Sequence, residues 1–158
     1  MKTSVFYERD EIFSELENLF EKNHIQYEKM TKTETESFAE RWFCEIVPPN
    51  SQKAARKHCF SADEYQNFLW HAFSYEYIPC FAGKHAKKAF DNAKFGETVL
   101  YMENDKIGYK LSGINGIKAL DLDSFMDIII TDKNFKRTYV HTHEEFCGPY
   151  FWERTKTN

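Results

Sequence analysis

The first half of the chain repeats apolar and polar positions with the period of an α-helix. Apolar side chains recur three or four residues apart, so each stretch has one face that suits a hydrophobic core. The basic and polar residues 51–59 show a weaker pattern, and we expect them to form a loop or a short helix. The pattern predicts four helices, over residues 8–23, 33–47, 61–73 and 82–93.

Two of these helices begin with the spacing of a capping box, in which a hydroxyl group and a carboxylate each accept a hydrogen bond from the other residue's backbone N–H. Thr33 with Glu36 has this spacing, and so does Ser61 with Glu64. Pro48 predicts the end of the second helix, because the residue before a proline disfavours the helical conformation. The helix that starts at Ser61 has the most regular apolar stripe of the four.

Near Gly96 the apolar pattern changes to a period of two, which is typical of β-strands. Three consecutive isoleucines at 128–130 indicate a strand that is covered on both faces. Residues 75–81 contain Pro79 and are expected to form a loop or an edge strand, and residues 122–126 a single helical turn. Strands are predicted over residues 98–103, 107–111, 127–131 and 137–143, with a further short strand at 150–153.

Helices that come first and strands that follow them define an α+β protein, not an alternating α/β one. The sequence therefore predicts about four N-terminal helices packed on a mainly antiparallel sheet of four or five strands, which the C-terminal half forms. The 158 residues include no linker, repeat or low-complexity tract, so we expect residues 1–158 to form a single domain.

Aromatic residues make up 17% of the chain, and the net charge is −4. Large rings either fill a core or form a contact surface, where Tyr and Trp are favoured because one end is apolar and the other polar. Basic residues do not form the clustered patch that phosphate binding requires, so no nucleic-acid partner is expected. The single basic concentration, at residues 53–57, suits a solvated helix face.

No segment predicts entry into a membrane. Residues 1–20 are acidic and lack the apolar region of a signal peptide. No apolar run approaches the ~20 residues that span a bilayer. We therefore expect a cytoplasmic protein with no membrane partner, whose four cysteines are reduced thiols.

The densest group of chemically useful side chains lies between residues 139 and 152. If residues 137–143 form one strand, alternation places Tyr139, His141 and His143 on the same face. Two imidazoles placed in this way could bind a metal ion, and zinc would need at least one further ligand. The candidates for that ligand are Glu145, Cys147, Asp127 and His71.

The same cluster has two alternatives without a metal. Glu144 and Glu145 could join the histidines in a binding site or in acid–base chemistry. In the other alternative the cluster is structural, and the histidines hydrogen-bond to acids beside them and across the hairpin.

Trp70 and His71 form a second candidate for binding. Both lie off the apolar stripe of the predicted third helix, so they face either another layer or solvent. An exposed tryptophan beside a histidine could line a pocket together with the strand that carries His141. In the structural alternative, Trp70 packs on the sheet and His71 interacts with the C-terminal end of the helix dipole.

Several familiar catalytic and nucleotide-binding motifs are absent from the sequence. No glycine-rich nucleotide fingerprint, nucleophile elbow or H-E-x-x-H zinc motif occurs. Cys80 and Cys147 are near histidines in the sequence, but no triad-like pattern supports a thiol nucleophile. An enzyme is therefore less favoured than a binding protein.

Several segments together resemble a small bacterial family of uncharacterised proteins. The resemblance depends on LWHAFSYEYIPC (Leu69–Cys80) and on the segments TYVHTHE and GPYF, which follow a D-x-x-x-x-D-x-x-F pattern. It extends from about Glu34 to Phe151, although Lys136 and Arg137 stand where a further aromatic would be expected. The resemblance implies a stand-alone cytosolic bacterial domain, and it implies no activity, because that family has no assigned function or catalytic residues.

Three hypotheses follow. The first is a small binding or regulatory domain that recognises another protein, by analogy with an immunity protein, and needs no cofactor. The second is a metal-assisted hydrolase with His141 and His143 as zinc ligands and Glu144 or Glu145 as general base. The third is a purely structural role for the histidines.

Overall fold

The computed structural model describes residues 9–60, 67–144 and 146–155, with side chains described from residue 13 onward. In chain order the elements are α1 (Arg9–Lys22), β1 (Tyr27–Lys29), α2 (Lys32–Ile46), the 3-10 turn η1 (Pro49–Ser51), α3 (Gln52–Cys59), α4 (His71–Ser74), β2 (Phe81–Ala82), α5 (Lys84–Asn92), β3 (Thr98–Met102), β4 (Ile107–Leu111), α6 (Ala119–Leu122), β5 (Ile128–Asp132), β6 (Arg137–His141) and β7 (Tyr150–Glu153).

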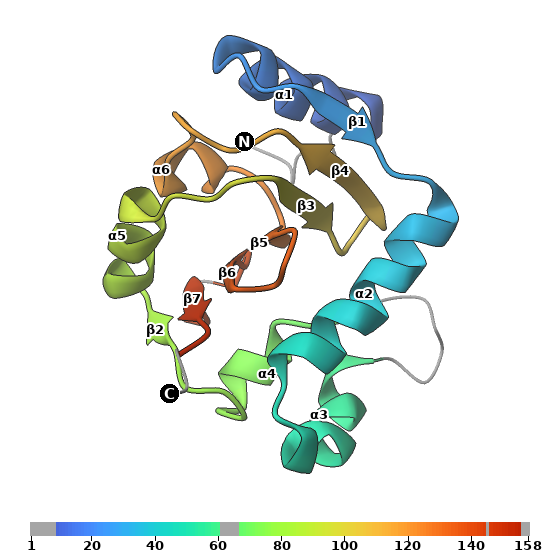
Figure 1. Ribbon diagram of the computed structural model, residues 1–158, viewed down its shortest axis with the longest axis vertical. Coiled ribbons are helices and arrows are strands. Elements are labelled where there is room, and N and C mark those ends of the chain that lie inside the picture. The colour runs from blue at the N-terminus through green and yellow to red at the C-terminus, as the bar shows by residue number, and fades with distance from the viewer. Residues whose placement is uncertain (1–8, 61–66, 145, 156–158) are drawn as a thin grey trace, which may run out of the picture.

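The strands form one sheet in the order β1-β4-β3-β5-β6-β7-β2, and every neighbouring pair is antiparallel (Figure 1). The predicted α+β class is confirmed, but the predicted numbers of elements are too low, because the described residues contain six α-helices and seven strands. The additional strands β1 and β2 lie at the two edges of the sheet and have three and two residues. Strands this short show no alternation that a sequence pattern could reveal.

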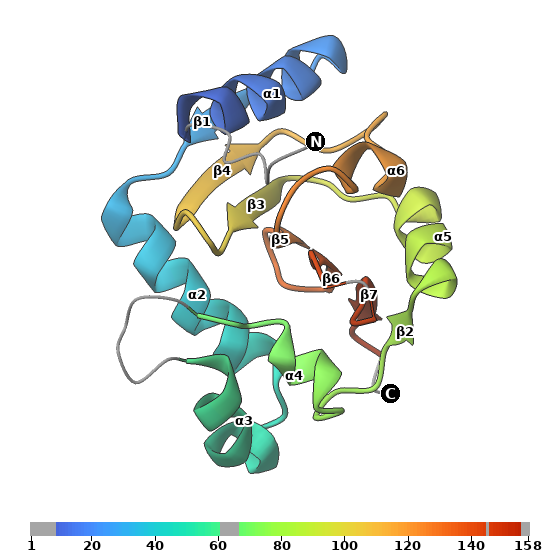
Figure 2. The same ribbon diagram turned by 180° about the vertical axis from the view of Figure 1, so that it is seen from behind.

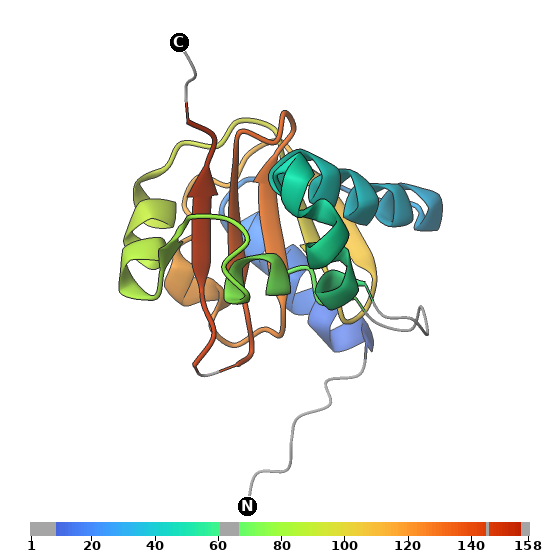
Figure 3. The same ribbon diagram turned by 90° about the horizontal axis from the view of Figure 1, so that it is seen from below.

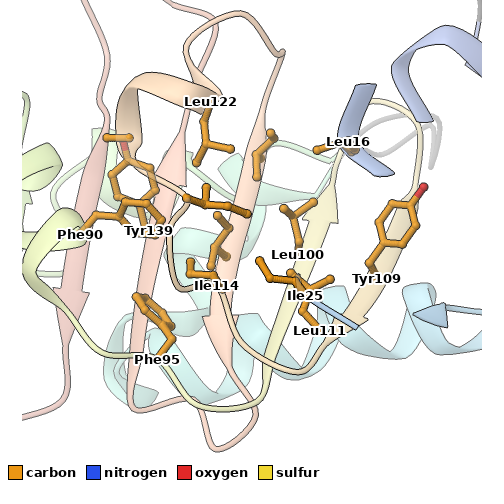
Figure 4. Packing of buried hydrophobic residues seen from close by; sticks show 14 of the residues in the cluster. Leu16, Ile25, Phe90, Phe95, Leu100, Tyr109, Leu111, Ile114, Leu122 and Tyr139 are labelled. Carbon is orange, nitrogen blue, oxygen red and sulfur yellow. The ribbon is translucent and has the colours of Figure 1, made fainter. Parts of the chain in front are cut away.

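Helices cover both faces of the sheet and enclose two separate cores. Side chains from α1, α5 and α6 fill the first core, and side chains from α2, α3 and α4 fill the second. Figures 1 and 2 show the two groups of helices on opposite sides of the strands, and Figure 3 views α3 and α4 in front of them. In β5, Ile128 and Ile130 join the first core and Ile129 joins the second, which confirms the prediction that this strand is covered on both faces. Figure 4 shows part of the first core.

The capping box of α2 lies two residues earlier than the sequence spacing of Thr33 and Glu36 predicts. Thr31 is the N-cap: its Oγ1 accepts the N–H of Glu34 at 3.2 Å, and the Glu34 carboxylate accepts the N–H of Thr31 at 3.0 Å. Both pairs of residues have the required spacing, so the pattern alone could not choose between them. Thr35 and Phe38, within the first turns of this helix, are buried.

Replacing Thr31 with alanine should lower the free energy of unfolding by about 1 kcal/mol, because the N–H of Glu34 loses its acceptor. Urea unfolding followed by circular dichroism measures the change. Thr33→Ala is the matched control: it should change stability by only a few tenths of a kcal/mol, because alanine is tolerated inside a helix. A larger loss from Thr33→Ala than from Thr31→Ala would contradict the assignment of the cap.

The predicted third helix is wrong over residues 67–70 and correct over residues 71–73, which belong to α4. Residues 61–66, which include the predicted capping box, lie outside the described residues. Phe68 instead donates its backbone N–H to Cys59, and helix α4 begins only at His71. Leu69 donates its backbone N–H to the Glu103 carboxylate at 2.6 Å, so a tertiary hydrogen bond replaces the helical one there.

The other boundaries differ less from the predictions. The basic segment forms helix α3, and the helical turn expected at residues 122–126 lies earlier, at Ala119–Leu122. Strand β6 ends at His141, two residues before the predicted end. The described part of the chain contains no helix that is long and apolar enough to span a membrane.

Candidate functional site

Two buried carboxyl groups face each other at one end of the sheet. Glu103 directly follows β3 and Asp127 directly precedes β5. The β3–β5 register pairs Met102 with Ile128, so the next opposing positions are Glu103 and Asp127. Alternation along the two strands places both side chains on the face of the second core. Their exposed fractions are only 1% for Glu103 and 0% for Asp127.

Each of these carboxyl groups has one satisfied oxygen and one without a partner. Glu103 Oε1 accepts the N–H of Leu69, and Asp127 Oδ1 accepts the N–H of His143 at 2.9 Å. Glu103 Oε2 and Asp127 Oδ2 are buried and have no hydrogen-bond partner among the described residues. Unpaired buried oxygens are uncommon in proteins, and they concentrate at functional sites or places of stored strain.

Burial raises the pKa of the Glu103 carboxyl group well above its ordinary value, and repulsion from Asp127 acts in the same direction. The N–H of Leu69 acts against these effects, because it stabilises the carboxylate. Burial therefore favours the protonated form of Glu103 more strongly than in an exposed glutamate. A protonated Glu103 is also a hydrogen-bond donor, which the sequence alone does not suggest.

His143 connects this buried pair to the protein surface. Its Nδ1 lies 2.8 Å from Asp127 Oδ1, and its Nε2 lies 3.2 Å from an oxygen of Glu144. The exposed fraction of the His143 side chain is 34%, whereas that of Glu144 is 51%. The imidazole ring is thus held between a buried and an exposed carboxylate, which fixes its orientation.

His71 lies near the same group of charges, within an aromatic cluster. Its ring is centred 4.1 Å from that of Trp70 and 5.2 Å from that of Tyr75, and its Nδ1 is 2.9 Å from the Ser74 hydroxyl. Burial lowers the pKa of His71, and the nearby His58 lowers it further. Asp127 and Glu144 act in the opposite direction, which relates His71 electrostatically to the carboxylates that hold His143.

The loop between β6 and β7 is closed by its own hydrogen bonds. Thr142 donates its hydroxyl to the carbonyl oxygen of Cys147, and Cys147 donates its N–H to the carbonyl oxygen of Glu144. Despite this closure, the side chain of Phe146 is 93% exposed. We call His143, Glu144 and Phe146 the loop patch.

Tyr139 and His141 do not join the loop patch. Both face the first core, where the ring of Tyr139 stacks on Phe90 with 4.3 Å between centroids (Figure 4). His141 is 7% exposed and its Nε2 lies 2.9 Å from the carbonyl oxygen of Phe125. Burial lowers the pKa of His141. The prediction that one strand carries His141 and His143 together is wrong, because β6 ends at His141.

The geometry also bears on the predicted metal ligands. His141 and His143 hydrogen-bond to different groups, Phe125 and Asp127. Over residues 9–60, 67–144 and 146–155, no three side chains of His, Cys, Asp or Glu are arranged so that they could hold a metal ion. Glu145, which the sequence also suggests as a ligand, lies outside the described residues. Zinc binding therefore stays a prediction without a defined third ligand.

The thiols of Cys59 and Cys80 differ from the reactive thiolate form that a nucleophile needs. Burial raises the pKa of Cys80 to about 11 and that of Cys59 to about 12. Both thiols are therefore protonated at neutral pH, which makes them poor nucleophiles.

Sequence reasoning missed Glu103 as a site residue. The available signal was an acidic residue directly after the apolar strand TVLYM, together with Asp127 directly before the three isoleucines. Each acid alone indicates only the end of a strand. Their relation depends on the β3–β5 register, which the sequence pattern does not provide.

The chain combines an antiparallel sheet that has helices on both faces with a partly exposed histidine beside two buried acids. Its sequence is similar to that of uncharacterised domains. It belongs to the family described as Domain of unknown function (DUF4275), whose model matches residues 14–151. No curated protein and no solved structure matches the chain. The resemblance to an uncharacterised family is thereby confirmed.

Proposed function

We propose that this protein is a small binding or regulatory domain that recognises another protein through the loop patch. The observation that carries the proposal is the 93% exposure of Phe146 on a loop closed by internal hydrogen bonds. A large apolar ring held in water costs free energy unless a partner covers it. Protein interfaces commonly use an aromatic anchor of this kind at their centre.

The neighbours of Phe146 support a protein partner with basic character. Glu144 is half-exposed beside the ring of His143, and the whole chain has a net charge of −4. An acidic side chain beside an apolar anchor, on a chain of negative net charge, favours a partner of opposite charge and speeds the encounter. The expected partner surface is an apolar pocket with Lys or Arg at its rim.

The orientation of His143 favours recognition over catalysis. Its two ring nitrogens are engaged by Asp127 and Glu144, so the ring is already positioned before a partner arrives. Side chains that are fixed in advance lose less conformational entropy on binding. Buried Asp127 has the supporting role here, because it accepts two hydrogen bonds from His143.

The biological role in the proposal is control or neutralisation of a partner protein in the bacterial cytoplasm, by analogy with an immunity protein. The four unpaired cysteines support a reducing compartment. No cofactor is part of the proposal.

Phe146→Ser should weaken partner binding by about 30-fold, equivalent to roughly 2 kcal/mol for a buried aromatic anchor. Leu120→Ser is the matched control, because Leu120 is 78% exposed and lies on α6, the layer on the other face. Wild type and both variants are immobilised and exposed to a lysate of the source organism. Any retained protein is then purified, and its dissociation constant is measured against all three chains.

The expected result is a protein that binds wild type and Leu120→Ser equally well and Phe146→Ser far more weakly. Equal binding to all three chains, or equal loss from both variants, would show that the loop patch is not the recognition surface.

A further inference from the structure

A groove lies between α2 and the strands β3 and β4, on the face of the second core. Its volume is about 480 Å³, which is within the usual range for small-molecule sites. The apolar part of the lining includes Phe38, Val99 and Phe135. The rings of Phe38 and Phe135 stack on each other, with an interplanar angle of 26° and 6.0 Å between centroids, and they are only 6% and 4% exposed, so a small part of each ring reaches the groove.

Five charged side chains line the groove and leave one cation unmatched. Lys110 pairs with Glu34, and Lys133 pairs with Glu97. The fifth is Arg41, whose guanidinium lies over the Phe135 ring at 4.9 Å from its centroid. Arg41 forms no ion pair with any of the described residues. Three cations and two anions give the lining a net charge of 3 − 2 = +1, although the chain as a whole is negative.

We propose that this groove binds a small aromatic monocarboxylate. Its ring packs against Val99 and the exposed rims of Phe38 and Phe135, and its carboxylate accepts two parallel hydrogen bonds from the Arg41 guanidinium. This fork-like geometry is the preferred pairing of arginine with a carboxylate. A single negative charge matches the charge of the lining, whereas a nucleotide or other polyanion would bring an excess that Glu34 and Glu97 repel.

The site is separate from the loop patch. The groove includes Thr98 at the start of β3, whereas the buried carboxyl pair of the candidate site begins with Glu103, just after the end of the same strand. The ligand proposal therefore holds or fails independently of the proposed recognition of a partner protein.

The test uses 2-naphthoate, with 2-naphthamide as its neutral counterpart and inorganic phosphate as a non-aromatic anion. Binding to the full-length chain is followed by amide chemical shifts in two-dimensional NMR. We expect saturable shifts at Arg41, Val99 and Phe135 with 2-naphthoate. The amide should bind at least tenfold more weakly, and phosphate should neither bind there nor displace the naphthoate.

Arg41→Gln should weaken naphthoate binding at least tenfold with only a small change in the melting temperature, because Arg41 is exposed and loses only its contact with the Phe135 ring. Arg41→Lys should recover part of the loss, because it keeps the charge but not the fork. Lys57→Gln, which removes an exposed cation outside the groove, is the matched control and should bind like wild type. The proposal is overturned by equal binding of naphthoate and naphthamide, by shifts located elsewhere, by unchanged binding in Arg41→Gln, or by absence of binding at millimolar ligand.

Discussion

Replacing Trp42 with alanine should lower the free energy of unfolding by about 3–5 kcal/mol, the range for removing a large buried ring. Trp42 is fully buried in the second core and packs edge-on against Phe73 of α4, at 6.0 Å between centroids. Its Nε1 donates a hydrogen bond to the Thr138 hydroxyl of β6 at 3.1 Å. One side chain therefore joins α2 to both α4 and the sheet. Urea unfolding monitored by far-ultraviolet circular dichroism measures the loss.

Trp42→Phe separates the packing from the hydrogen bond. Phenylalanine keeps an aromatic ring but leaves the Thr138 hydroxyl without its donor, so we expect a smaller loss of about 1–2 kcal/mol. Thr138 itself still donates to the carbonyl oxygen of Ile130 at 2.9 Å, which limits the cost. If the alanine variant were as stable as the phenylalanine variant, Trp42 would not be the packing centre of the second core.

Glu103→Gln should stabilise the protein at neutral pH by roughly 1–3 kcal/mol, the range for relieving an unsatisfied buried polar group. The amide oxygen can still accept the N–H of Leu69, and the amide nitrogen can donate toward the unpaired Oδ2 of Asp127. The change also replaces a buried group that can ionise by one that stays neutral, so the cost of burying it no longer depends on its proton.

The gain in unfolding free energy from Glu103→Gln should grow as pH rises. Burial raises the pKa of Glu103 above its ordinary value of 4.5, so between these two pKa values the folded chain holds a proton that the unfolded chain has released. The stability of the wild type therefore falls as pH rises above about 4.5 and through the raised pKa, and the variant lacks this loss. Urea midpoints of both proteins at pH 5 and pH 8 measure the difference.

Glu28→Gln is the control, because Glu28 is an exposed acid on the edge strand β1. It should leave the difference between the two pH values close to that of the wild type. A Glu103→Gln variant whose advantage shrinks with rising pH would contradict the raised pKa of Glu103.

The sequence pattern predicted those elements whose apolar periodicity and tertiary environment agree. The isoleucines at 128–130 form a strand covered on both faces, and residues 98–102 and 107–111 pair as expected. The pattern failed between residues 67 and 70, where a regular helical stripe does not form a helix. There the N–H of Leu69 is donated to Glu103, a partner 34 residues away that no local pattern reveals.

Part of the candidate site was also predictable from the sequence, and part depended on contacts between distant residues. His71, His143 and Glu144 are chemically distinctive in the sequence. The structure relates His71 and His143 to Asp127, and Glu144 to His143. His141 was expected beside His143, but the chain leaves the strand after His141, so the alternation that would align the two rings ends there. The position of Glu103 opposite Asp127 follows from the β3–β5 register alone, which the sequence pattern does not provide.

The two shortest strands of the sheet, β1 and β2, limit how another chain could pair with the sheet edges. A long exposed edge would offer a row of free N–H and C=O groups on which another chain could pair, whether a ligand peptide or a second copy during aggregation. With three residues at one edge and two at the other, only a few such groups are available. Backbone pairing with another chain is therefore weak at both edges, so the proposed recognition of a partner depends on side chains.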